Sequence, residues 1–402
     1  MNIPLIRQFL PLVIALLTLN SCIRGRDNAI STSSVLTESG NDLTVDGERY
    51  ADSILNCLTL EQRVGQCFMP SIYASHDSST INRFRKYVSD LHVGGIVLLK
   101  GDLYSAAILS EEGERGGAPM FIAMDAEWGL GMRLTDAPGF PRNGRLGPAA
   151  DEALLFEYGN EVARECRRVG INMVLGPVVD VVENPEGIIG SRSFGGDPVR
   201  VANLGIAYAR GLESGRVISV AKHFPGHGSP SEDSHHTLPV IKRTLNQLDS
   251  VDLYPFRRYI ESGLTGIMVG HLAVPAVDPD NLPAAVSYPV IHDLLREELG
   301  FKGLILTDAL NMGGAEGYDA IAALRAGADI IVSPADTEKE IRKVIEEIRS
   351  GNLPVSIIND RCRRILFHKY LVKGDDRRII VYDDLLEDVY FGTDSLRLRL
   401  KR

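Results

Sequence analysis

The sequence predicts an α/β fold in which eight parallel strands and their helices form a single (β/α)8 TIM-type barrel. From about residue 50, short apolar runs alternate with longer amphipathic stretches. Several of the short runs are apolar throughout, which is typical of strands covered on both faces. A doubly wound open sheet is the alternative. No Gly-x-Gly-x-x-Gly turn follows the first run, which argues against the dinucleotide-binding form of that fold.

The predicted strands are runs rich in β-branched and other apolar residues. They cover residues 66–70, 95–99, 120–125, 172–176, 217–222, 266–271, 303–308 and 329–333. The predicted helices between them cover residues 151–168, 198–214, 245–262, 288–299, 337–350 and 354–370. Because a TIM-type barrel carries its active site at the carboxyl ends of its strands, chemically active residues are expected there.

Polar residues stand at or just beyond the ends of five predicted strands. In chain order they are Asp125, Asp180, Lys222, His223, His271 and Asp308. A carboxylate at the end of a buried strand is costly unless a polar site solvates it. Asp308 is therefore a candidate site residue, although an Asp in that position could also cap the following helix. Asp180 could equally serve the structure alone.

Composition excludes several classes of protein. The 402 residues include 43 Lys and Arg against 53 Asp and Glu, a net charge of −10, and 44% are hydrophobic. The ordinary apolar fraction and mixed charge argue against disorder. The acidic balance, without a dense basic stripe, argues against nucleic-acid binding. One strongly apolar segment, at the extreme amino terminus, excludes a protein with many membrane spans.

That amino-terminal segment is predicted to be a secretion signal. Residues 9–19 are apolar but too short to span a bilayer, and Arg7 precedes them. Leu19-Asn20-Ser21-Cys22 resembles the bacterial lipobox, which implies cleavage before Cys22 and its lipidation. An ordinary signal peptide with an incidental Cys is the alternative. The lipobox implies a protein anchored in the bacterial cell envelope, on the periplasmic side of a membrane or on the outer surface.

The most informative stretch is a loop rich in histidine. It reads Lys222-His223-Phe-Pro-Gly-His227-Gly and continues to Asp233-Ser234-His235. Its Pro and Gly residues indicate a loop. A metal site is the competing interpretation, but there is no helical His-x-x-x-His pair and no cage of carboxylates. Asp233 is better placed to orient one imidazole, so neither a metal nor another cofactor is expected. The remaining cysteines at 57, 67, 166 and 362 show no zinc spacing, and no disulfide is predicted.

These motifs resemble glycoside hydrolase family 3, and within it the bacterial β-N-acetylglucosaminidases. The family pattern is a Lys-His-Phe-Pro-Gly-His-Gly loop, then Asp-Ser-His, then Thr-Asp-x-Leu-x-Met. This chain carries these blocks at 222–228, 233–235 and 307–312. Weaker matches occur at 58–66, 94–96, 176–181 and 192–195, so the resemblance runs from about residue 50 to about 372.

The resemblance implies a role for each matching residue. Asp308 is expected to be the nucleophile that forms a covalent glycosyl-enzyme, and His235, paired with Asp233, the general acid and base. The sugar is expected to be held by Asp125, Arg133, Arg192, Lys222, His223 and His271. A His with a near-neutral pKa can protonate the leaving oxygen and then deprotonate water. It also does not repel an anionic acceptor, so phosphate could replace water.

The implied activity is removal of terminal β-linked N-acetylglucosamine from peptidoglycan fragments or other glycans. Alternatives are a β-glucosidase or β-xylosidase, a phosphorylase of the same family, or a sugar-binding lipoprotein without catalysis. One departure from the family pattern puts the aglycone in doubt. Leu130 stands where the family has Arg, and Trp128 stands in place of Gly. Trp128 could stack on a sugar or pack beneath the loop.

The predicted organisation has four parts. Residues 1–21 form a signal peptide, residues 22–49 the lipidated Cys22 and a flexible tether, and residues 50–373 the barrel. Residues 374–402 are a tail, which either begins a linker such as longer family members have or ends the chain as a short amphipathic segment; a charged, solvated tail is expected. The expected partners are a carbohydrate substrate and a membrane through Cys22, with no nucleic acid, and a monomer is expected.

Overall fold

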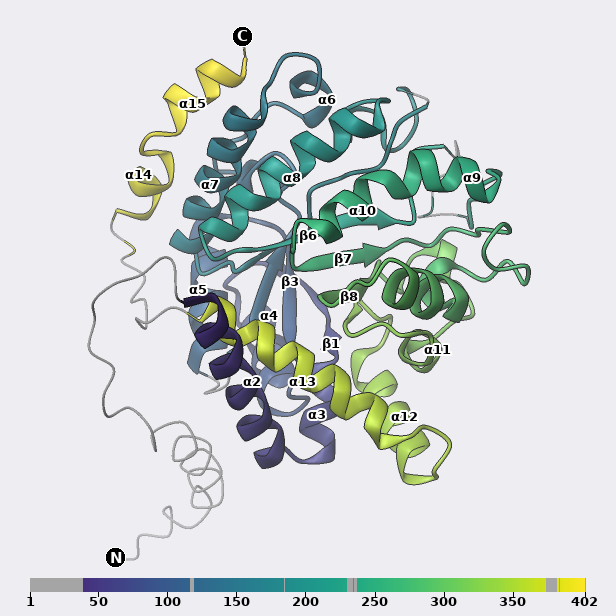
Figure 1. Cartoon of the computed structure of the whole chain (residues 1–402). Helices are drawn as coiled ribbons and strands as arrows, with labels where there is room; N and C mark the ends of the chain where they lie inside the picture. Colours follow the sequence, from purple (N-terminus) through teal and green to yellow (C-terminus); the bar gives the residue numbers. More distant parts are fainter. Residues whose placement is uncertain are drawn as a thin grey trace, which may run out of the picture.

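The computed structural model describes residues 39–115, 119–183, 185–229, 234, 237–373, 382 and 384–401. These residues form an α/β fold in which parallel strands curl at the centre and helices cover the outside (Figure 1). The signal peptide, Cys22 and the first part of the predicted tether lie outside the described residues. Within the described ranges, no helix combines the length and the apolar character that a membrane span requires.

The larger sheet has seven parallel strands in chain order. They are β2 (Ser71–Ala74), β3 (Gly95–Gly101), β4 (Phe121–Met124), β5 (Met173–Val174), β6 (Ile218–Phe224), β7 (Gly266–Val269) and β8 (Leu304–Thr307). A smaller parallel sheet pairs β1 (Phe68–Met69) with β9 (Ile331–Val332). Pro70 alone separates β1 from β2, and an isolated parallel bridge joins Leu306 of β8 to Ile330, just before β9.

Each of the eight predicted strand ranges overlaps an observed strand, so their positions are confirmed. The additional strand, β2, alternates between buried and more exposed residues. Strands β4, β7 and β8 are buried at every position, as expected for parallel strands between two apolar layers. This arrangement directs the carboxyl ends of the strands toward one edge.

The helices lie between the strands along the chain. Those preceding β6 are α2 (Ser39–Cys57), α3 (Leu60–Gln66), α4 (Ser78–Ser89), α5 (Leu103–Arg115), α6 (Asn143–Leu146), α7 (Glu152–Arg168) and α8 (Pro198–Ser214). Those following β6 are α9 (Leu245–Gln247), α10 (Leu253–Glu261), α11 (Ala320–Ala326), α12 (Thr337–Arg349), α13 (Val355–Val372), α14 (Leu385–Tyr390) and α15 (Thr393–Leu400). Short 3-10 segments are η1 (Leu130–Met132), η2 (Gly190–Arg192), η4 (Ala284–Val286) and η6 (Gly313–Ala315). Two segments have π-helical bonding, η3 (Leu248–Asp252) and η5 (Pro289–Glu298).

Local signals explain where the predicted helices begin. The Asp151 carboxylate accepts from the Leu154 N–H and caps α7. Asp197 caps α8, and Pro198 occupies the first turn, where its missing N–H costs nothing. The helix predicted over 245–262 is divided, because η3 interrupts it between α9 and α10. The change to π-helical bonding has no signal in the hydrophobic spacing, which continues through it.

The two ends of the chain correct the sequence analysis. Residues 39–49, predicted to belong to a flexible tether, are part of α2. This helix packs against α13 through a small apolar cluster that includes Ala51, Ile54 and Leu366. The apolar residues that anchor α2 begin at Tyr50, and the polar residues before it continue the same helix.

The described part of the tail is also not a solvated segment. Leu385, Val389, Leu396 and Leu400 are buried in α14 and α15. Arg164 of α7 donates to three backbone carbonyls of this region, so the two helices are fastened to α7 (Figure 1). The prediction of a charged, solvated tail is wrong for residues 384–401, because each of the two helices contributes two apolar side chains, four residues apart, to the main core.

Candidate active site

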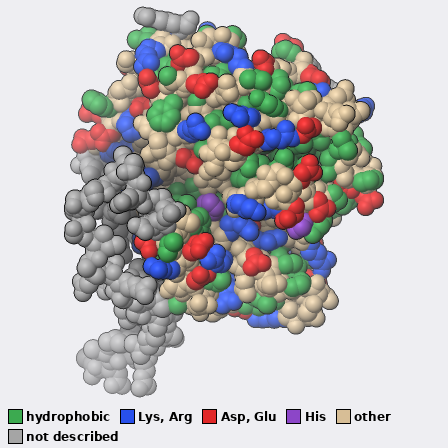
Figure 2. Space-filling model, in the orientation of Figure 1, with side chains coloured by type: hydrophobic (Ala, Val, Ile, Leu, Met, Phe, Trp, Pro, Cys, Tyr) green, Lys and Arg blue, Asp and Glu red, His purple; other side chains and the backbone are tan. Residues whose placement is uncertain are grey.

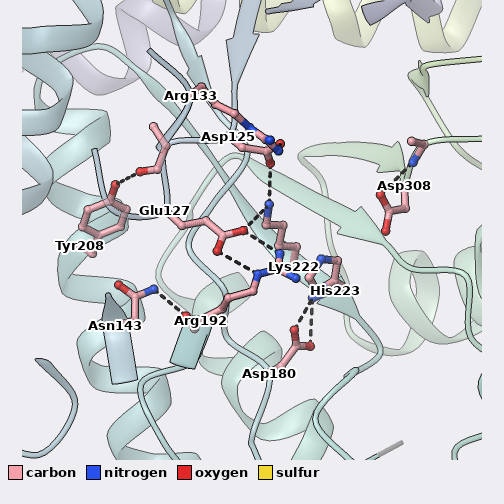
Figure 3. Close-up of polar contacts among 12 residues, drawn as sticks. Asp125, Glu127, Arg133, Asn143, Asp180, Arg192, Tyr208, Lys222, His223 and Asp308 are labelled. Carbon is pink, nitrogen blue, oxygen red and sulfur yellow. Dashed lines mark hydrogen bonds and ion pairs between the residues drawn. The ribbon is translucent and has the colours of Figure 1, made fainter. Parts of the chain in front are cut away.

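The carboxyl ends of the parallel strands bring together residues that are far apart in the sequence (Figure 3). Asp125 directly follows β4, Lys222 and His223 belong to the last part of β6, and Asp308 directly follows β8. His271 lies two residues beyond β7. The predicted clustering of these residues at one edge of the sheet follows from the parallel strand order.

Lys222 is the centre of the largest polar cluster. Its ammonium lies 2.7 Å from Asp125 Oδ1 and 2.9 Å from Glu127 Oε1, and only 3% of its side chain is exposed. Arg192 contacts the same Glu127 carboxylate through two nitrogens, at 2.7 and 3.0 Å. Arg133 donates to the other oxygen of Asp125. Two carboxylates and three cations thus hold one another in fixed positions.

The charges of this cluster keep both carboxylates ionised. Burial raises the pKa of Glu127, but the charges of Lys222 and Arg192 outweigh it and bring the pKa to about 2. Burial likewise opposes ionisation of Asp125, yet Lys222 and Arg133 hold its pKa well below the usual range. The pKa of Lys222 is raised, because Asp125 and Glu127 outweigh the effect of burial. Asp125, partly exposed, therefore presents a carboxylate that can accept hydrogen bonds from sugar hydroxyls.

A second cluster orients His223 and the loop that follows it. The fully buried Asp180 carboxylate accepts from the His223 backbone N–H at 3.0 Å and from its Nδ1 at 2.8 Å. It also accepts from the His227 backbone N–H at 2.7 Å. Because a carboxylate only accepts, Nδ1 of His223 carries the proton, and Nε2 is left to face the site. Asp180, whose role the sequence left open, positions two members of the histidine loop.

Asp308 lies across from these clusters (Figure 3). Its Oδ1 accepts from the N–H of Ala309 at 2.8 Å. Burial opposes ionisation, but the neighbouring His223 and His271 rings, the Ala309 N–H and the Lys222 ammonium together lower its pKa below the ordinary value. The alternative that Asp308 caps a helix is wrong, since β8 is followed by a turn and by η6, which begins after Met312. The carboxylate is therefore ionised and partly exposed.

His271 is buried beside Asp308. Its Nε2–H donates to the carbonyl of Ala309 at 3.0 Å, and among the described residues its Nδ1 has no hydrogen-bond partner. Burial lowers the pKa of His271, which keeps the ring neutral near pH 7. His271 thus supports the backbone next to Asp308 and leaves one unpaired nitrogen close to that carboxylate.

Some site predictions cannot be placed. Asp233 and His235 lie outside the described residues. Ser234 between them is described, and its hydroxyl lies 3.1 Å from His227 Nε2. Among the described residues, no group of three His, Cys, Asp or Glu side chains is arranged to hold a metal ion.

Sequence reasoning gave no role to Glu127, the buried partner of both Lys222 and Arg192. Its position two residues after Asp125, on the same side of an extended strand end, is the signal that could have indicated it. Arg142 lies over the Trp128 ring, 4.7 Å from its centroid, so this indole packs against a neighbouring cation. Leu130 is fully buried in η1, where it joins the core.

A parallel α/β sheet with an ionised Asp and fixed charged side chains at the carboxyl ends of its strands has the arrangement of an enzyme active site. Residues 59–367 match the family model described as Glycosyl hydrolase family 3 N terminal domain. The chain belongs to glycosyl hydrolase family 3, as the sequence motifs indicated. It is a glycosidase, and its substrate is a carbohydrate.

Named relatives agree with this assignment. A beta-hexosaminidase from Nitrosomonas eutropha is 36% identical over 258 residues, which is 60% of this chain and 73% of the relative. A solved family 3 beta-N-acetylglucosaminidase from Paenibacillus sp. is 32% identical with a TM-score of 0.73, covering 83% of this chain and 68% of that one. A beta-N-acetylhexosaminidase from Beutenbergia cavernae is 30% identical with a TM-score of 0.70, covering 78% and 98% respectively.

Proposed function

We propose that this protein is a retaining exo-β-N-acetylglucosaminidase that removes terminal β-linked N-acetylglucosamine from peptidoglycan fragments or other glycans. The observation that carries the proposal is the ionised Asp308 at the end of β8, facing the fixed Asp125–Lys222–His223 edge (Figure 3). The names of the relatives, beta-hexosaminidase and beta-N-acetylglucosaminidase, support the choice of sugar.

In the proposed reaction, Asp308 attacks the anomeric carbon while His235 protonates the leaving oxygen. His235 then takes a proton from water, which releases the sugar from Asp308 with overall retention. Asp233 orients the imidazole and stabilises its charged form. The lowered pKa of Asp308 supports its part in this scheme, because a nucleophile must be ionised near neutral pH.

The sugar is held by the opposite edge of the site. Asp125 accepts from hydroxyl groups, and Lys222, Arg133 and Arg192 donate to hydroxyl oxygens or keep Asp125 and Glu127 in position. His223 offers Nε2, since Asp180 occupies its Nδ1. His271 completes the wall beside the nucleophile.

We further propose that the strands close into one complete (β/α)8 barrel spanning residues 50–373. The Leu306–Ile330 bridge and the single residue between β1 and β2 support closure. Expression of residues 39–401 should then give one cooperative unfolding transition, and two separate transitions would contradict a single domain.

The amino-terminal sequence supports a further proposal, that Cys22 is lipidated and anchors the protein in the bacterial cell envelope. Metabolic labelling with a fatty acid should mark the full chain and leave the Cys22→Ser variant unlabelled. Equal labelling of both proteins would exclude Cys22 as the attachment site.

Replacing the nucleophile is the main test. The Asp308→Asn variant should lose measurable release of 4-nitrophenol from the β-N-acetylglucosaminide, because no covalent intermediate can form. Asp293→Asn, which removes an exposed carboxylate on η5, is the control and should keep full activity. Activity of Asp308→Asn at the wild-type level would refute the nucleophile assignment.

Product analysis separates the neighbouring activities. Turnover of the glucoside or xyloside in place of the N-acetylglucosaminide would make the enzyme a β-glucosidase or β-xylosidase. Formation of N-acetylglucosamine 1-phosphate in phosphate buffer would make it a phosphorylase. Binding of N-acetylglucosamine without any turnover would leave only a sugar-binding protein.

The general acid has its own test. His235→Ala should slow hydrolysis of substrates with poor leaving groups by about 10² to 10⁴-fold. Substrates with good leaving groups need little protonation and should be affected less. A uniform loss across leaving groups would count against an acid role for His235.

A further inference from the structure

A hollow lies at the edge of the sheet opposite the active site. It has a volume of about 790 Å³ and lies between α13, η5 and the segments that lead into β7, β8 and β9. Because these segments precede the strands, the hollow belongs to the amino-terminal edge, whereas Asp308 and His271 follow β8 and β7. Figure 2 shows Lys and Arg side chains gathered on this face beside a hollowed surface.

Three partly buried arginines, Arg296, Arg361 and Arg364, line the hollow. Arg296 and Arg364 both contact the fully buried carboxylate of Asp329. Arg361 also lines the hollow, and within the described residues it donates to the backbone carbonyls of Ala328 and Leu324. Two guanidinium groups thus contact Asp329, and the third has no carboxylate contact among the described residues. Burial lowers the pKa of Arg296 to about 10, and the positive charges of Arg364 and Arg361 act in the same direction. The carboxylate of Asp329 opposes this shift but does not cancel it.

A buried imidazole also borders the hollow. His368 of α13 lines it and is 7% exposed, and among the described residues its Nδ1 has no hydrogen-bond partner. A buried polar atom without a partner is uncommon in native proteins and indicates a missing ligand or water. The unpaired Nδ1 of His368 thus belongs to the same lining as the three arginines.

We propose that this hollow binds a phosphate-type dianion, as hydrogenphosphate or as a phosphate monoester. Three arginines against Asp329 leave an excess of two positive charges, which one dianion would balance. Guanidinium groups bind phosphate oxygens through paired N–H donors, and Arg361 has donors that Leu324 and Ala328 do not use. The rim also carries exposed charges of both signs, Glu48, Glu297 and Asp360 against Lys302, and solvent weakens the effect of each on a bound anion without removing it. The volume exceeds that of a single phosphate, which leaves room for an organic group.

Calorimetric titration with inorganic phosphate and with phenyl phosphate, at constant ionic strength, tests the proposal. Wild-type protein should bind at least one of the two, and Arg361→Gln should weaken that binding by about tenfold or more. Arg361→Lys, which keeps the charge, should restore part of the affinity. Arg325→Gln, which removes an exposed arginine of α11, is the matched control and should bind as the wild type does.

The outcomes separate the possible ligands and the possible sites. Tighter binding of phenyl phosphate would identify a monoester site, and equal or tighter binding of inorganic phosphate a site for the free ion. Phosphate bound near Asp308 would be insensitive to Arg361→Gln, so equal binding by that variant and the wild type would overturn the proposal. Absence of binding to the wild type would also overturn it.

A second variant covers the case in which Arg361→Gln does not fold. Lys302→Gln removes an exposed charge at the rim of the same hollow and should weaken phosphate binding by about two- to threefold through the lost long-range attraction. An unchanged affinity in Lys302→Gln, together with wild-type binding that does not weaken with salt, would contradict an electrostatic site in this hollow.

Discussion

The two edges of the sheet are organised around buried charges of opposite sign. At the carboxyl edge, the central group is a cation, Lys222, between the carboxylates of Asp125 and Glu127. At the amino edge, it is a carboxylate, Asp329, between the guanidinium groups of Arg296 and Arg364. Both centres are almost completely buried, so each depends on its partners for stabilisation.

The sign of the centre decides what each edge can bind. At the carboxyl edge, Asp125 is the partly exposed carboxylate of the cluster and can accept from further donors, which in the proposed function are sugar hydroxyls. A central carboxylate leaves the outer N–H groups of its arginines to donate, which suits an anion that only accepts. A buried charge between two groups of opposite charge is thus found at both edges, and its sign gives the two proposed sites different chemistry.

Removing the central cation should have the largest effect. Lys222→Met leaves two buried carboxylates without their shared partner, so we expect a loss of stability of about 3 to 5 kcal/mol. The fixed geometry of Asp125 would also be lost, and kcat/KM should fall by about 10² to 10³-fold. Thermal unfolding and hydrolysis of the 4-nitrophenyl substrate measure the two effects.

A lysine in a half-exposed ion pair provides the comparison for that variant. Lys343→Met breaks the pair with Asp319, whose partners are 47% and 28% exposed, and should change stability by less than about 1 kcal/mol. Equal free energies of unfolding for the two lysine variants would contradict the proposal that Lys222 stabilises the buried cluster.

The amino edge contains a buried lysine, Lys369, which can be compared with the buried Lys222 of the carboxyl edge. Lys369 is 1% exposed, and its ammonium donates to Gln66 Oε1 at 2.6 Å. Burial lowers its pKa from 10.5 to about 7. Between these two pH values the unfolded chain binds more protons than the folded one, so the free energy of unfolding should rise with pH in this window.

Replacing Lys369 should remove this pH dependence. Lys369→Met is expected to stabilise the protein by about 2 kcal/mol at pH 7, because an apolar group replaces a buried charge. The gain should shrink as the pH rises from 7 to above 10.5, because the folded lysine loses its charge first and the unfolded lysine loses it around 10.5. Urea unfolding at several pH values measures this, with the exposed Lys339→Met as reference. A gain that is constant with pH would show that packing, not charge, is responsible.

The sequence predicted the positions of strands and helices better than it predicted which side chains contact one another. Strand positions followed from short apolar runs, and the starts of α7 and α8 followed from Asp151 and Pro198. Such signals are local. The pairing of Glu127 with Lys222, 95 positions later in the chain, depends on the parallel order of β4 and β6 and has no local signal.

The same limit explains the corrected ends of the chain. The polar residues before Tyr50 and the basic residues after Leu396 indicated solvent by composition alone. Their apolar neighbours are few, and each becomes significant only because α13 or α7 offers a complementary surface. Docking of a short helix is decided by its partner, which a single local stretch of sequence does not specify.

The smallest effect is expected from an exposed ion pair at the amino edge. Asp52 of α2 and Arg363 of α13 lie 2.5 Å apart, with side chains 53% and 39% exposed. Solvent screens such a pair, so Asp52→Asn should change the free energy of unfolding by about 0.5 kcal/mol or less. Urea unfolding at low and high salt measures it, and the small difference should vanish at high salt. A loss comparable to that of Lys222→Met would mean that exposed pairs, and not the buried centres, stabilise both edges of the sheet.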